Sequence, residues 1–136
     1  MGFNATHMYR GQHERLRHHA EMMLHATTES AHTLLLARLA GSLKMHLKGE
    51  DESLYPHLLT HGSAEVRIKA AQFQMSMSEF SERFDRFYQR WTKEGSIASD
   101  PAGYQAELRV IIDSLVRRMD LEDNELYALA DRLNAA

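Results

Sequence analysis

His46 and Glu50 stand four residues apart, a spacing that could bring two metal ligands together. On a helix, such side chains share one face with Cβ atoms roughly 6 Å apart, so both can reach one cation. The sequence has nine histidines and no cysteine. Without thiolates, disulfides, cysteine-bound zinc sites and the usual iron–sulfur clusters are excluded. Nitrogen and oxygen side chains are therefore the only strong metal ligands in this sequence.

The elements that would position these ligands are four long helices, because apolar residues recur at alternating steps of three and four. We expect helices at about 5–25, 30–61 and 63–91, a loop at 92–99, and a last helix that starts at 99–101. Thr27-Thr28 and Ser99-Asp100-Pro101 are typical helix starts, whereas Pro56 and Gly62 bend and end the second helix. The short connections favour an all-α, up-down-up-down four-helix bundle, with residues 1–136 as a single domain.

Four polar residues interrupt stripes that should otherwise be apolar and face the bundle core: His13, His46, Glu50 and Glu122. The third helix offers no ligand, since its stripe is aromatic and aliphatic throughout. A bare carboxylate in an apolar interior is unstable, and a divalent cation offsets that cost. The residues therefore predict a metal site. The alternative is a buried polar network without chemistry, in which the four groups pair with one another or with Arg118.

Three stretches resemble the motifs of the hemerythrin-like (HHE cation-binding) family. Residues 12–17, Gln-His-Glu-Arg-Leu-Arg, resemble the first motif. Residues 46–56 resemble the second, with a histidine and a glutamate four apart and a Leu-Tyr-Pro ending. Residues 118–129 are similar to the motif of the fourth helix. The resemblance extends over nearly the whole sequence and implies a hemerythrin-like bundle with iron as its metal.

The sequence departs from the family pattern at three ligand positions. Members of this family usually bind two irons, bridged by two carboxylates and capped by histidines from all four helices. Here Phe73 and Met77 stand at the ligand positions of the third helix, and Arg118 replaces the histidine that would precede Glu122 by four residues. We expect Phe73 and Met77 to fill the vacated volume, and Arg118 to supply positive charge beside it.

The resemblance implies that all the missing residues cap the same iron. The residues that remain, His13 and His46, would cap the other iron, and Glu50 and Glu122 would be the former bridging carboxylates. This comparison predicts a degenerate site that holds one ion rather than two. Iron is the metal that the family implies, and the same nitrogen and oxygen ligands also suit zinc or manganese.

By resemblance, the function would be to sense or bind a small gas or oxidant, or to handle the metal. Reversible oxygen transport is not expected from one ion. An alternative is a mononuclear non-heme enzyme that activates oxygen or water. The sequence offers no separate general acid or base, which favours binding over catalysis. A third interpretation is a metal-free interaction module, in which Arg118 pairs with Glu50 and Glu122.

Charge and hydropathy exclude some partners and locations. The formal net charge of −3 and pI near 6.3 leave no basic surface that would attract nucleic acid. The most apolar stretch, 34–43, is interrupted by Arg38, so neither a membrane span nor a signal peptide is expected. These features predict a cytoplasmic protein, and they do not specify an oligomeric state.

Other side chains near the predicted ligands have simpler interpretations. Four acidic residues are interpreted as solvated neighbours of the ligands: Asp51, Glu52, Asp123 and Glu125. Three tyrosines could either donate hydrogen bonds to the site or pack as ordinary core aromatics: Tyr9, Tyr55 and Tyr127. His18, His25 and His32 are spaced by seven, but His32 should lie beyond the first helix break, so a second metal site is not expected.

Overall fold

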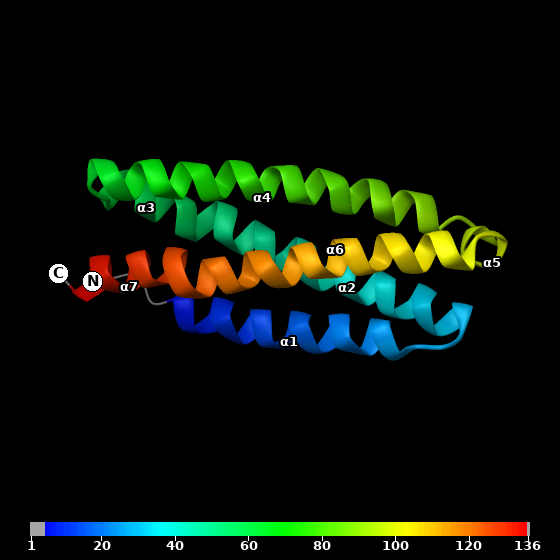
Figure 1. The fold of residues 1–136 in the computed structure, drawn as a ribbon. Coiled ribbons are helices and arrows are strands. Elements are labelled where there is room, and N and C mark those ends of the chain that lie inside the picture. The colour runs from blue at the N-terminus through cyan, green and yellow to red at the C-terminus, as the bar shows by residue number, and fades with distance from the viewer. Residues whose placement is uncertain (1–4, 136) are drawn as a thin grey trace.

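The computed structural model describes residues 5–135, and the side chains of these residues up to 133. Four long helices run alternately up and down (Figure 1): α1 (Thr6–His25), α2 (Glu29–Gly49), α4 (Ala64–Trp91) and α6 (Pro101–Leu121). Shorter elements extend or connect them: η1 (Glu50–Leu54), α3 (Tyr55–His61), α5 (Ser96–Ser99), η2 (Glu122–Leu126) and α7 (Tyr127–Ala135). The predicted all-α, up-down-up-down bundle is confirmed, and none of the described helices is long and apolar enough to cross a membrane.

The helix starts follow from side-chain caps, of which those at Thr28 and Asp100 were predicted and that at Ser63 was not. A side-chain oxygen accepts a backbone N–H three residues on at three helix starts: Thr28 from Ala31 (3.1 Å), Ser63 from Val66 (3.3 Å) and Asp100 from Gly103 (3.0 Å). The predicted loop at 92–99 was partly wrong, because it contains the single turn of α5. Gly95 precedes this turn with a φ of 75°, a left-handed conformation that glycine adopts without strain.

Gly62 ends α3 for a reason of space rather than of backbone angle. Its φ and ψ of −76° and 157° are extended, so any residue could adopt them. A Cβ atom at this position, however, would lie 2.5 Å from the Leu58 carbonyl oxygen and 2.6 Å from Cγ1 of Val66. The close approach of α3 and α4 therefore requires glycine here.

Replacing Gly62 by alanine should lower the free energy of unfolding by about 1–3 kcal/mol, because backbone must move to accept the methyl group. Gly41 is the matched control, since a Cβ atom there meets nothing within 4 Å in the middle of α2. Gly41→Ala should raise the same free energy by roughly 0.5–1 kcal/mol. Urea unfolding measures the free energy of unfolding of both variants. A change of the same sign in the two variants would contradict the argument.

The buried interior consists of two apolar clusters with a polar layer between them. The larger cluster includes Leu16, Leu43 and Met119, and it extends toward α5. The smaller includes Tyr9, Leu54 and Leu126, near the opposite end. The predicted ligands lie in the sequence between residues of the two clusters, in the segments 9–16, 43–54 and 119–126. The fold therefore places the four polar side chains in one cross-section of the bundle.

Candidate metal centre

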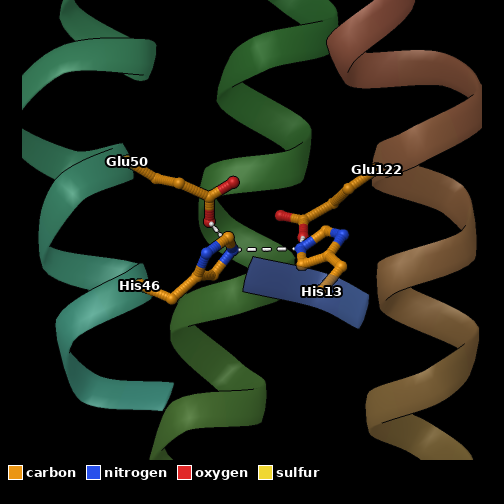
Figure 2. A group of neighbouring side chains, drawn as sticks. All are labelled: His13, His46, Glu50 and Glu122. Carbon is orange, nitrogen blue, oxygen red and sulfur yellow. Dashed lines mark hydrogen bonds and ion pairs between the residues drawn. The ribbon is translucent and has the colours of Figure 1, made fainter. Parts of the chain in front are cut away.

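The structure brings the four predicted ligands together in the interior. Side chains of His13, His46, Glu50 and Glu122 point toward one another from α1, α2, η1 and η2 (Figure 2). Each offers one ligand atom, and these atoms all lie within 4.8 Å of one another. Nε2 of His13 is 3.0 Å from both Nε2 of His46 and Oε1 of Glu122, and Nε2 of His46 is 3.3 Å from Oε1 of Glu50. None is more than 2% exposed.

Each of the two glutamates begins a π-helical turn. The N–H of Tyr55 bonds the carbonyl of Glu50, and the N–H of Tyr127 bonds the carbonyl of Glu122, both across five residues. The uninterrupted second helix that we predicted at 30–61 was therefore wrong in this detail. Such turns insert an extra residue into a helix and are frequent at functional sites. Each turn has the sequence Glu-Asp-x-x-Leu, followed by Tyr, a repeat that could have revealed their equivalence.

The outer nitrogens of the two imidazoles are held by side chains that orient the inner nitrogens. Nδ1 of His13 lies 2.7 Å from Oδ1 of Asp123, and Nδ1 of His46 lies 2.6 Å from Oε1 of Gln12. A carboxylate or an amide oxygen can only accept, so each Nδ1 carries the proton. The lone pair of each neutral ring is then on Nε2, facing the centre, which is the arrangement of a metal-binding histidine.

Asp123 was wrongly interpreted as a solvated neighbour. Its side chain is only 22% exposed, and its second oxygen accepts a hydrogen bond from Arg17 at 2.6 Å. The packing of α1 beside this part of the chain turns Asp123 toward His13, a contact that local spacing does not reveal. The other three acids fit the prediction better, since Asp51 and Glu52 are exposed and Glu125 pairs with Lys69 at the surface.

Of the three tyrosines, Tyr127 reaches the centre itself. Its hydroxyl donates to Oε2 of Glu50 at 2.6 Å and lies 3.1 Å from Nε2 of His13. Burial raises the pKa of Tyr127, and the nearby charges of Glu122 and Glu50 raise it further, so the hydroxyl remains a donor. Burial likewise raises the pKa of Tyr55, whose buried hydroxyl has no hydrogen-bond partner within residues 5–133.

Within residues 5–133, three of the four carboxylate oxygens of the centre lack a hydrogen-bond donor. Across the described side chains, Oε1 of Glu50 and both oxygens of Glu122 accept no hydrogen bond, although imidazole nitrogens lie at 3.0–3.3 Å from the two Oε1 atoms. Burial, followed by the charge of Glu50, holds the pKa of Glu122 well above its usual range. Burial also lowers the pKa of His13, although Asp123 opposes this change. Converging lone pairs without donors fit a cation, so the residues present suit a metal ion.

The neighbouring position, where ligands are replaced, is nearly filled. Phe73 is half-buried and Met77 is buried. The remaining cavity is about 30 Å³ and is lined by Phe73, Ser76, Met77, Arg118, Leu121 and Glu122. This volume is roughly that of one water molecule.

Arg118 is held by the third long helix and not by the carboxylates. Its guanidinium donates to Oγ of Ser76 and lies over the ring of Phe80, 5.6 Å from the ring centre. Within residues 5–133 it forms no ion pair, so the pairing with Glu50 and Glu122 that the metal-free interpretation would require is not formed. Its charge still lowers the pKa of Glu122, although less than burial raises it.

Comparison with known proteins agrees with this site and fold. The family model for the hemerythrin HHE cation binding domain matches residues 4–130, which is nearly the whole sequence. No curated protein and no solved structure gives a significant match. On the strength of the matching family model, the chain belongs to the hemerythrin HHE cation-binding domain family.

Proposed function

We propose that this protein binds one metal ion through Nε2 of His13, Nε2 of His46 and the carboxylates of Glu50 and Glu122. The observation that carries the proposal is the convergence of these lone pairs in a buried layer where, among residues 5–133, three of the four carboxylate oxygens have no hydrogen-bond donor. Two anions in an apolar interior repel each other and are poorly solvated, and a divalent cation removes both costs. The outer contacts of the imidazoles support this assignment, because they leave both Nε2 atoms free to bind.

A single ion is favoured because the second position has lost both its ligands and its space. Phe73 and Met77 cannot replace histidine as ligands to a hard cation, and the residual cavity is about 30 Å³. Arg118 supplies a permanent positive charge beside Glu122, which a second ion would otherwise provide. Arginine cannot change oxidation state, so two-metal redox chemistry is not proposed.

Iron is the ion that we propose, on the basis of family membership. Imidazole and carboxylate ligands suit iron and also accommodate zinc or manganese. Bound there, the metal would supply a position where a small gas or oxidant can coordinate. The protein would then act by sensing or binding that molecule, or by holding the metal itself.

Binding is favoured over catalysis because, once the histidines and glutamates hold a metal, the remaining proton donors near the centre are tyrosines that are poorly suited to proton transfer. The hydroxyl of Tyr127 is engaged by Glu50, and the pKa values of Tyr127 and Tyr55 are raised far from neutrality. General acid–base catalysis works best with a pKa near the operating pH. The side chains of this centre therefore hold and orient a metal more readily than they transfer protons.

The proposed stoichiometry predicts about one metal ion per chain, measured by elemental mass spectrometry on untagged protein. Two ions would overturn the single-site proposal, and none would shift the weight to a metal-free interaction module. The double variant Phe73→His, Arg118→His restores two ligands and removes the competing charge, so its metal content should rise toward two ions per chain. Phe73→Leu, Arg118→Met is the matched control and should stay at one. A restored variant that also stays at one would contradict the vacated-site argument.

A further inference from the structure

A groove between α4 and α6 has the features of a second binding site. The two helices lie side by side (Figure 1), and the cavity between them has a volume of about 600 Å³. Small-molecule sites typically have volumes of roughly 300–1,000 Å³. The groove is lined by residues 83–90 of α4 and 106–111 of α6, toward the α5 end, whereas the candidate metal centre lies nearer the other end.

One wall of the groove is basic although the whole chain is acidic. Arg83, Arg86 and Arg90 project along the same face of α4, and Glu107 is the acid that lines the groove with them. Glu107 pairs with Arg90 at 2.8 Å, and Arg83 donates to Ser114 at 2.9 Å. The structure gives Arg86 no ion pair within residues 5–133. Two positive charges therefore remain without a counter-charge, on a protein whose net charge is −3.

The floor of the groove is apolar. Phe87 and Ile111 form its base at 7% and 6% exposure, and Val110 beside them is 63% exposed. The exposed side chain of Val110 offers apolar contact to an aliphatic chain. The arginines beside it offer a partner to an anionic group at the end of that chain. If the ligand were a small polar anion, the apolar floor of the groove would stay exposed to water. If it were a neutral hydrocarbon, the guanidinium of Arg86 would stay without a counter-charge.

We propose that this groove binds an amphipathic monocarboxylate, a fatty acid in chemical class. The aliphatic chain would lie over Phe87, Val110 and Ile111, and the carboxylate would pair with Arg86. A guanidinium can donate two parallel hydrogen bonds to a carboxylate, and Arg83 and Arg90 on either side add attraction without giving up their present partners. The proposal does not depend on the metal, since none of the groove residues belongs to the metal centre.

The test is isothermal titration of the full chain with three ten-carbon probes, kept below the concentrations at which they form micelles: decanoate, decanol and decylammonium. Decanoate should bind saturably and at least tenfold more tightly than decylammonium, with decanol between them. Arg86→Gln should weaken decanoate binding about tenfold, the effect of losing one charge-assisted pair. Arg117→Gln, at an exposed position of α6 outside the groove, is the matched control and should bind like wild type.

Val110→Glu tests the floor independently, and it should also weaken decanoate binding about tenfold because it adds a like charge at an exposed position. Circular dichroism confirms that each variant is folded. Equal binding of the three probes, or no change in Arg86→Gln, would overturn the proposal. Repeating the titration after chelation separates this site from the metal centre, since decanoate affinity should not change when the metal is removed.

Discussion

Removing the metal by chelation should lower the melting temperature of the wild-type protein by roughly 10–15 °C. A ligand that binds only the folded state stabilises it by about 4 kcal/mol when present at 1,000 times its Kd. For a domain of this size, each kcal/mol corresponds to roughly 3–4 °C. Differential scanning calorimetry before chelation, after chelation and after metal is restored measures the effect. A melting temperature that does not respond to chelation would contradict the proposed metal site.

Glu122→Gln provides the internal control, because it should lower the stability of the metal-loaded protein and raise the stability of the apoprotein. The variant loses a ligand, so it should no longer respond to added metal. In the apoprotein, however, a neutral amide replaces a buried carboxylate that accepts no hydrogen bond from residues 5–133 and is repelled by Glu50. The variant apoprotein should therefore be more stable than the wild-type apoprotein at pH 8, by about 1–3 kcal/mol.

The pH dependence of this difference follows from the raised pKa of Glu122. Its unfolded reference value is 4.5, and burial raises the pKa in the folded state. The folded chain therefore holds the proton more tightly, and this stabilisation is complete below pH 4.5 and lost as the pH rises through the folded pKa. The advantage of Glu122→Gln over the wild-type apoprotein should thus be larger at pH 8 than at pH 5. The lowered pKa of His13 affects both proteins and largely cancels in the comparison. A variant that is less stable at both pH values would contradict the argument.

Replacing Asp123 by alanine should weaken metal binding about 10- to 100-fold without changing any ligand. Asp123 accepts from Nδ1 of His13 at 2.7 Å, and this contact keeps the lone pair on Nε2. Without it, the ring can rotate or carry its proton on the inner nitrogen, and either change opposes metal binding. Competition with a chromophoric chelator measures the affinity.

Asp120→Ala is a matched control, because Asp120 and Asp123 both accept from Arg17 but only Asp123 contacts His13. Asp120 is 58% exposed, so its loss should leave metal affinity within about twofold of wild type. If both variants weaken binding equally, the effect would come from Arg17 and not from the orientation of His13.

The sequence by itself determined the four helices and the polar residues that face their core. Apolar residues at steps of three and four set the inner face of each helix, and His13, His46, Glu50 and Glu122 occupy positions on those faces. Their burial follows because a helix has only one face toward the core. The caps at Thr28 and Asp100 could be predicted because the backbone N–H that each side chain accepts lies only three residues away in the sequence.

Only the tertiary structure decided which side chains hold the four proposed ligands in place. The contacts of Asp123 with His13, Gln12 with His46 and Tyr127 with Glu50 join residues 110, 34 and 77 positions apart. Helical periodicity gives the direction of a side chain about its own axis, but not the rotation and height of the neighbouring helix. Arg118 illustrates the same limit, because local spacing predicted its position near Glu122 but not that its guanidinium would bond Ser76 of α4. The π turns that begin at Glu50 and Glu122 were likewise not predicted, because each inserts one residue into the regular helical period after the carboxylate.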